Sequence, residues 1–303
     1  MKVWDDIFID YLQYERGCSA NTVNGYRTVL KEFRQYVGGL PVEGEFSWDE
    51  VDGDTVRNWM MKMMDEGRAA TTVNFKLSAL RSFYRFLLLR KMLEKDPVHN
   101  VQGPKKAKLL PSYMKDEEMD KLFDSEGFFS DDFAGERDRL MLLMFYSTGI
   151  RAAELISLDL ASVDLDSMQL KVLGKRNKQR IVPYGDELGD ALRSYLSLRE
   201  EFQKERHPDE TALFLDEKSG SRITYAKVRT KVRYYLSLVT SRGKRSPHVL
   251  RHTFATTMLN HHADLQSVKE LLGHEKLSTT EIYTHTSFED LKEMYNQAHP
   301  RAK

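Results

Sequence analysis

Basic side chains stand at two points where the sequence predicts that a helix begins. The Ser-Pro pair at 246–247 predicts a helix start, because proline is favoured at the first helical position. His248 and Arg251 lie three residues apart just inside it, so both point the same way near the positive end of the helix dipole. Arg151 follows a tight turn at another predicted helix start, with Glu154 placed to contact its guanidinium. Both segments are candidate anion sites.

Three further residues would add a proton donor and a nucleophile. Lys175 lies in "GKRNK", a predicted hairpin turn, while His274 and Tyr283 belong to the polar segment "GHEKLSTTEIYTH". Arginines stabilise the charge that builds up on a phosphate in the transition state. A tyrosine oxygen is a nucleophile once its proton is removed, and a departing alkoxide needs a general acid. These residue types together are what metal-free cleavage of a phosphodiester requires.

Each of these residues also has an ordinary structural interpretation. His274 by itself is typical of a helix C-cap contact, and Tyr283 of a half-buried core tyrosine. Arg151 with Glu154 is also typical of an intrahelical pair, and Lys175 of a solvated turn. Composition alone does not assemble these residues into one site.

Charge is segregated along the chain although the net charge is zero, with 46 basic and 46 acidic residues. The segments 67–93, 171–180 and 218–263 contain basic residues and no acidic ones. Such runs are either solvated helix faces or a basic surface that binds phosphate. The candidate DNA-binding residues are Arg68, Lys76, Arg81, Arg85, Arg176, Lys178, Arg242, Lys244 and Arg245.

Apolar periodicity predicts a mainly α (α+β) protein. Ser19 is placed to cap one helix, and a second begins near Thr71, each with apolar residues spaced by three and four. Further on, a buried helix closed by glycine, an antiparallel hairpin and several more helices are expected. The predicted domains are a helical N-terminal domain at 1–102, a basic, proline-containing linker at 103–112, and a mostly helical domain with a small sheet at 113–303.

Composition excludes several classes of protein. Cys18 is the only cysteine, which excludes a disulfide framework and a cysteine-based zinc site. His261 and His262 are adjacent and would diverge on a helix, so no metal is expected there. The segment 1–10 lacks the features of a secretory signal, and the longest apolar run, 140–146, is too short to span a bilayer. We therefore expect a cytoplasmic protein.

Four sequence blocks, in this order and spacing, resemble the tyrosine recombinase (phage integrase) family and especially its bacterial Xer-type members. They are "STGIRAAEL", "GKRNKQRIVPY", "HVLRHTFAT" and "LLGHEKLSTTEIYTH". The first domain is similar to the family's core-binding domain through "SANTVNGYRTVLKEF", so the resemblance spans essentially the whole chain. By this resemblance the catalytic residues are Arg151, Lys175, His248, Arg251, His274 and Tyr283.

The resemblance also implies a mechanism and partners. Tyr283 would form a 3′-phosphotyrosyl link without a cofactor or metal, and Lys175 would protonate the leaving 5′ oxygen. Four protomers, as a homo-tetramer or a hetero-tetramer with a sister recombinase, would act on two DNA duplexes through a Holliday junction. Chromosome dimer resolution, linked to cell division in a bacterial nucleoid, is the expected role. A mobile-element integrase, a DNA invertase and a non-catalytic DNA-binding protein are the alternatives.

Two departures from the family pattern and one tail feature lead to structural expectations. His262 stands where relatives usually have glycine, and a histidine tolerates a positive φ less well. Thr257 stands where relatives often have histidine, which puts local helix packing in doubt. Near the C-terminus, Phe288, Leu291, Met294 (or Tyr295) and Ala298 form a narrow apolar stripe. We expect this stripe to dock into a neighbouring protomer, the alternative being packing on its own domain.

Overall fold

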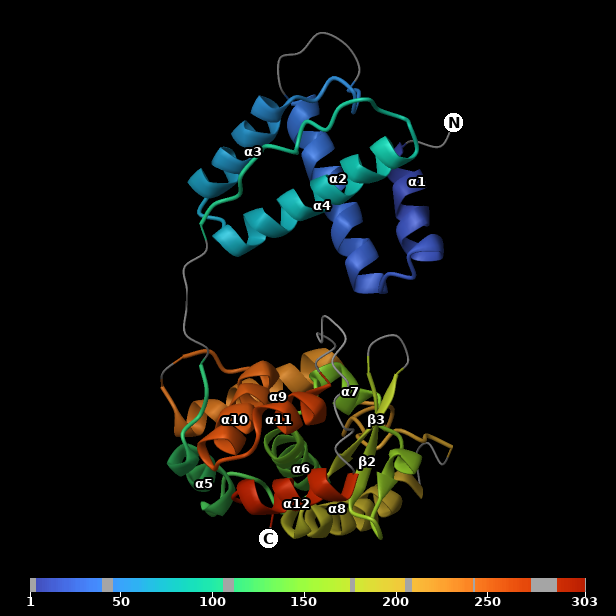
Figure 1. Cartoon of the computed structure of the whole chain (residues 1–303). Coiled ribbons are helices and arrows are strands. Elements are labelled where there is room, and N and C mark those ends of the chain that lie inside the picture. Colours follow the sequence, from blue (N-terminus) through green and yellow to red (C-terminus); the bar gives the residue numbers. More distant parts are fainter. Residues whose placement is uncertain are drawn as a thin grey trace. The chain divides into compact units, whose positions relative to one another are not determined.

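The computed structural model describes residues 4–39, 46–105, 112–174, 178–204, 209–241, 243–273 and 288–302. The chain divides into two compact units, Met1–Leu109 and Leu110–Lys303, which are described separately (Figure 1). Among the helices described, none is both long and apolar enough to cross a membrane.

The first unit is helical. It consists of α1 (Trp4–Asp10), the π-helical turn η1 (Tyr11–Glu15), α2 (Ala20–Gly38), α3 (Gly53–Asp65) and α4 (Ala70–Leu89). Ser19 caps α2, as predicted, by accepting a hydrogen bond from the Thr22 N–H. The apolar faces of these helices meet in an aromatic core in which Phe33 packs between Trp48 and Trp59. The two helices predicted from periodicity are therefore confirmed.

The second unit combines helices with one small sheet. In chain order it contains α5 (Asp116–Asp124), α6 (Phe133–Thr148), α7 (Ala152–Ile156), the 3-10 turn η2 (Leu160–Ser162), β1 (Val163–Asp164), β2 (Gln169–Leu173), β3 (Gln179–Pro183), α8 (Asp186–Lys204), α9 (Tyr225–Val239), α10 (Pro247–Asn260), α11 (Leu265–Leu272) and α12 (Phe288–Ala298). The strands pair antiparallel in the order β1-β2-β3, with Leu170 opposite Val182. This arrangement confirms the mainly α fold with a small antiparallel sheet.

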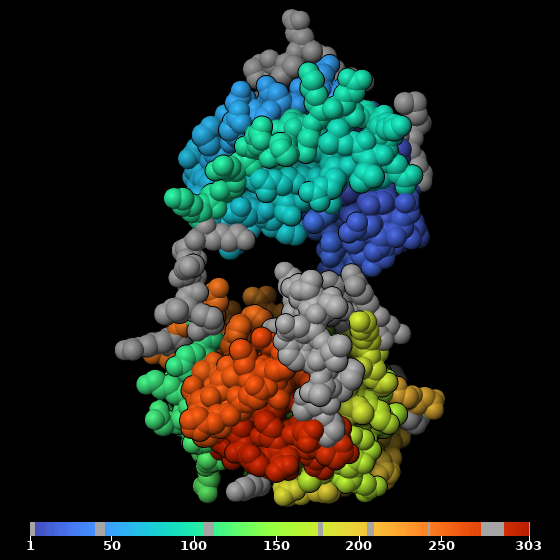
Figure 2. Space-filling model, in the orientation of Figure 1, coloured from blue at the N-terminus to red at the C-terminus, as the bar shows by residue number. Residues whose placement is uncertain are grey.

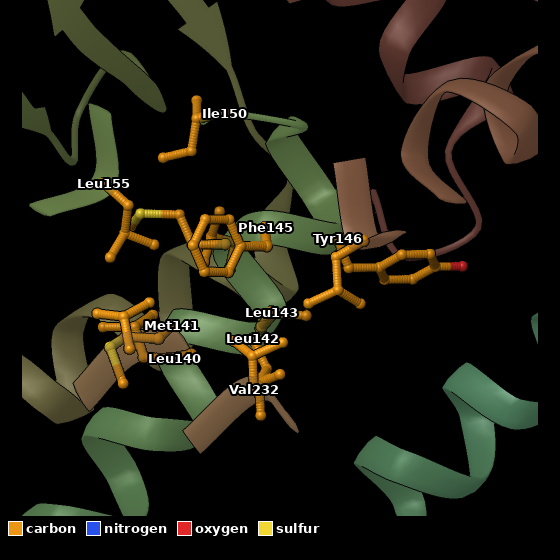
Figure 3. Close-up of a cluster of buried hydrophobic side chains, with 14 of the residues drawn as sticks. Leu140, Met141, Leu142, Leu143, Phe145, Tyr146, Ile150, Leu155 and Val232 are labelled. Carbon is orange, nitrogen blue, oxygen red and sulfur yellow. The ribbon is translucent and has the colours of Figure 1, made fainter. Parts of the chain in front are cut away.

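Helix α6 forms the centre of the second unit. Its residues 140–146 are all buried and all hydrophobic, so this stretch is apolar on every face. Figure 3 shows Met141 and Phe145 gathered with Ile150 and Leu155 in this core. Gly149 ends the helix with φ +60, and a Cβ there would lie 2.4 Å from Phe254. A glycine is therefore required where the chain turns from the core toward Arg151.

In this structure helix α12 packs on its own domain, which was the alternative expectation, and docking of the stripe into a neighbouring protomer stays a prediction. Leu291, Tyr295 and Ala298 are buried against α10 and α11. In the space-filling view the red surface of α12 continues directly from the orange surface of these two helices (Figure 2). The amphipathic pattern correctly predicted a buried face, but it did not specify which surface covers that face.

His262 adopts the positive φ that a histidine tolerates less well than a glycine. Its φ is +66, directly after the C-terminal end of α10. Thr257, the second departure, is buried, and its hydroxyl hydrogen-bonds to Asp116 at 3.1 Å. The threonine is therefore accommodated in the packing, whereas the histidine carries backbone strain.

We expect His262→Gly to stabilise the protein by about 0.5–1 kcal/mol, since glycine removes the left-handed strain but gains entropy when unfolded. Denaturant unfolding of the two proteins measures the change. His261→Gly is the matched control, because His261 has φ −93 and gains nothing from glycine. Equal or lower stability of His262→Gly would show that the histidine side chain makes a compensating interaction.

Candidate active site

Arg151 is held at the start of α7 by a carboxylate one turn ahead. Its N–H donates to Glu154 Oε2 at 2.7 Å, and its Nη1 donates to Oε1 of the same side chain at 2.8 Å. Glu154 therefore accepts a backbone N–H at the N-terminus of α7 and also orients the Arg151 side chain. The Arg151 side chain remains 43% exposed, so part of its guanidinium is available to a ligand.

Arg251 of α10 is buried, and its guanidinium links the C-terminal ends of α6 and α11. Nη1 donates to the Gly149 carbonyl at 2.7 Å and Nη2 to the Leu272 carbonyl at 2.6 Å. Burial, and then the charge of Arg151, lower the pKa of Arg251 to about 10, which still leaves the guanidinium charged at neutral pH. Arg251 thus places a positive charge between the end of α6 and the end of α11.

His248 lies one turn before Arg251 on the same helix and is exposed. Burial of part of its ring, followed by the nearby His252, Arg251 and Arg151, lowers its pKa. The ring therefore favours the neutral form, which can accept a proton at one nitrogen and donate a hydrogen bond from the other. Its ring centroid lies 4.4 Å from that of His252.

Glu154 also binds a second arginine, which belongs to the basic run 171–180 but is not among the predicted site residues. Arg180 of β3 donates from Nη1 and Nη2 to the two Glu154 oxygens, both at 2.9 Å, and from Nε to the Leu271 carbonyl at 3.0 Å. Burial would raise the pKa of Glu154, but hydrogen bonds from Arg180 and Arg151 outweigh it and lower that pKa to about 2. The carboxylate is therefore charged and shared between two guanidinium groups.

Three of the six predicted catalytic residues are described, and they occupy one region. The charge of Arg151 contributes to lowering the pKa of both His248 and Arg251, so the three residues lie near one another. Lys175, His274 and Tyr283 lie outside the described residues. Two described glycines adjoin this region: Gly174, which precedes Lys175, and Gly273, which precedes His274. A Cβ on Gly174 would lie 3.9 Å from Glu154 Oε1, and the Gly273 carbonyl accepts from Arg151 Nη2 at 3.4 Å.

The predicted DNA-binding residues of the first unit differ in availability. Arg68, Arg81 and Arg85 are exposed, although Arg81 also donates to the Val101 carbonyl at 2.5 Å. Lys76 is 13% exposed, forms an ion pair with Glu32 and lies over the Trp59 ring. Its ammonium group is therefore already engaged within the unit.

In the second unit, Lys178 and Lys244 are exposed and Arg245 is half-buried. The Arg245 Nε is a buried donor with no hydrogen-bond partner among the residues that the structure describes. Arg176 and Arg242 lie outside the described residues. In the same described part of the chain, no three His, Cys, Asp or Glu residues form a cluster that could hold a metal ion.

Known protein families match both units. The phage integrase family matches residues 112–290, and the phage integrase N-terminal SAM-like domain matches residues 6–91. Tyrosine recombinase XerC of Chlorobaculum tepidum is 37% identical over 319 residues, covering 99% of this chain and 95% of that protein. Tyrosine recombinase XerC of Azotobacter vinelandii is 38% identical, covering 98% of this chain and 96% of that protein.

Solved structures share the fold. The XerH site-specific recombinase bound to palindromic difH substrate matches with a TM-score of 0.70 at 21% identity, over 94% of this chain and 78% of that chain. A lambda integrase dimer bound to a core site matches with a TM-score of 0.67 at 19% identity, over 92% of this chain and 98% of that one.

Proposed function

This chain belongs to the phage integrase family of tyrosine recombinases, and we propose that it is the Xer-type enzyme that resolves chromosome dimers. The observation that carries the proposal is the arrangement of Arg151, His248 and Arg251 around the end of α6, within a chain whose full length matches XerC proteins. The carboxylate of Glu154 is already occupied, so the exposed part of Arg151 is free to bind a phosphate.

In the proposed reaction the Tyr283 oxygen attacks the scissile phosphorus and forms a 3′-phosphotyrosyl bond, and the neutral His248 ring accepts the proton that the tyrosine hydroxyl loses. The bond from phosphorus to the 5′ oxygen breaks, and Lys175 supplies the proton that this oxygen takes up. Arg151 and Arg251 stabilise the negative charge on the non-bridging oxygens, while His248 and His274 lie beside the phosphate. Attack by the 5′ hydroxyl of the partner duplex reverses these steps and joins the strands through a Holliday junction.

We assign the DNA contacts to both domains. Residues 1–102 form the core-binding domain, 103–112 the linker and 113–303 the catalytic domain. The exposed basic residues of the first domain include Arg68, Arg81 and Arg85. Those of the second domain include Lys178 and Lys244. Such contacts position the protein on phosphates. The active assembly is a homo-tetramer or hetero-tetramer on two duplexes, in the cytoplasm of a bacterium and associated with its nucleoid.

A nicked suicide duplex tests this function. The nick lies near the cleavage point, so the cut fragment diffuses away and the covalent protein–DNA product accumulates. We expect an adduct that survives denaturation and maps to the peptide containing Tyr283. Retardation of the duplex without any adduct would instead identify a non-catalytic DNA-binding protein.

Cleavage should not require a divalent metal. We expect EDTA to leave the yield and rate of the covalent adduct unchanged, because Arg151 and Arg251 supply the charge stabilisation that metal ions supply in nucleases. The measurement is single-turnover adduct formation with and without chelator. Loss of the adduct in EDTA and its recovery with magnesium would contradict the proposed role of the two arginines.

A further inference from the structure

We propose that Arg180 is a positioning residue for the cleavage reaction, one that fixes three catalytic segments relative to one another. The inference rests on the proposed function and extends it to a residue outside the six assigned to catalysis. Arg180 lies on β3, five residues after Lys175 in the chain. Its guanidinium contacts α7 through Glu154 and the end of α11 through Leu271.

The first segment is the start of α7, which carries Arg151. Arg180 binds both oxygens of Glu154, a pairing in which two parallel N–H groups fix the plane of the carboxylate. The same carboxylate accepts the Arg151 N–H and one of its guanidinium N–H groups. The orientation of Arg151 therefore depends on Glu154, and that of Glu154 depends on Arg180.

The second segment is the end of α11, which precedes His274. Arg180 Nε donates to the Leu271 carbonyl, while Arg251 donates to the carbonyl of Leu272. Gly273 has φ +64, and a Cβ there would lie 3.2–3.3 Å from Arg180 Cδ, Nε and Nη1. The backbone at the end of α11 therefore packs closely against the Arg180 side chain. Only glycine allows this close approach without displacing the arginine.

The third segment is the β2–β3 hairpin, which carries Lys175. Its described base is closed by the Gly174 N–H, which donates to the Lys178 carbonyl at 2.8 Å. A Cβ on Gly174 would lie 3.7 Å from Arg180 Nη1 and 3.9 Å from Glu154 Oε1. The base of the hairpin therefore rests against the ion pair of Arg180 and Glu154.

Charge balance supports a positioning role over direct phosphate binding. The Arg180 side chain is 16% exposed, and three of its five N–H groups are directed at Glu154 and Leu271. Its positive charge offsets Glu154, which leaves the charge of Arg151 uncompensated and available to a phosphate. Without Arg180, the Glu154 carboxylate would pair with Arg151 alone and reduce that excess.

The test compares Arg180→Gln, Arg180→Lys and Arg222→Gln in the full-length protein on a nicked duplex. Arg222→Gln is the matched control, since Arg222 also joins a carboxylate, Asp159, to backbone carbonyls, those of Ile156 and Leu158. Half-site affinity, melting temperature and the single-turnover rate of adduct formation at saturating protein are measured for each variant.

We expect Arg180→Gln to cut the adduct rate by about 100-fold at unchanged half-site affinity, since small displacements of reacting groups cost about that much. Arg180→Lys should recover only part of the rate, because an ammonium cannot bind both carboxylate oxygens and the carbonyl with a planar fork. Arg222→Gln should lower the melting temperature comparably yet keep the rate within about threefold of the wild-type rate.

Three results would overturn the inference: an unchanged rate for Arg180→Gln, an affinity loss as large as its rate loss, or equal rate losses for Arg180→Gln and Arg222→Gln. If Arg180→Gln does not fold, the same criteria apply to Arg180→Lys, which keeps the positive charge. A wild-type protein that forms no adduct refutes the proposed function itself. A wild-type adduct together with an unaffected Arg180 variant refutes only the positioning role.

Discussion

Tyr283→Phe is expected to bind the recombination site as tightly as the wild-type protein and to form no covalent adduct. The substitution removes one oxygen, the proposed nucleophile, and leaves the basic residues that bind phosphates unchanged. It also leaves Arg151, His248 and Arg251 in place around the end of α6, so the phosphate would still be held but not attacked. The loss should therefore appear entirely in the chemical step.

Electrophoretic mobility on an intact duplex measures binding, and denaturing electrophoresis after incubation with the nicked duplex measures the adduct. Tyr234→Phe is the matched control, since Tyr234 is an exposed tyrosine of the same domain. That variant should form the adduct at the wild-type rate. An adduct formed by Tyr283→Phe would assign the nucleophile to another residue.

Local sequence signals predicted the elements that carry the site. The Ser-Pro pair at 246–247 marks the start of α10, and the glycines at 149 and 273 mark the ends of α6 and α11 with positive φ. These signals are readable because caps and turns depend on a few adjacent residues. The strained His262 was anticipated in the same way, since its conformation depends on its own backbone.

Contacts between distant segments could not be predicted from one sequence. Lys76 pairs with Glu32, 44 residues away, and Arg180 pairs with Glu154 across 26 residues. Periodicity says which side chains face inward, but it does not say which charges meet there. Arg251 shows the same limit. Its spacing from His248 indicated an anion site, whereas its burial and its two carbonyl contacts depend on where α6 and α11 end.

The tail illustrates why an amphipathic helix does not identify its partner. The stripe on α12 fits a surface made by α10 and α11 of the same chain, where Phe254, Met258 and Leu271 are buried beside it. Residues beyond the helix add polar contacts to this packing. His299 Nε2 donates to the Tyr146 carbonyl at 3.2 Å, and Arg301 donates to Glu187 at 2.7 Å.

Deleting residues 288–303 is therefore expected to unfold the catalytic domain or to lower its melting temperature sharply. The deletion removes Leu291 and Tyr295 from the core and uncovers the apolar surface on which they pack. Burying each large apolar side chain contributes about 1.5–3 kcal/mol, so the combined loss is a large part of a typical stability of about 5–15 kcal/mol.

A point substitution isolates this effect from truncation. Tyr295→Ala leaves a cavity in the same core and should cost about 3–5 kcal/mol, as large-to-small core substitutions do. Asn296→Ala, on the exposed face of the same helix, is the matched control and should leave the free energy of unfolding nearly unchanged. Denaturant unfolding of the full-length variants measures both.

If the truncated protein and Tyr295→Ala both keep wild-type stability, α12 does not belong to the core of its own domain. Packing of α12 on α10 and α11 predicts the opposite, because Tyr295 is 1% exposed and its loss would leave a cavity among close-packed side chains.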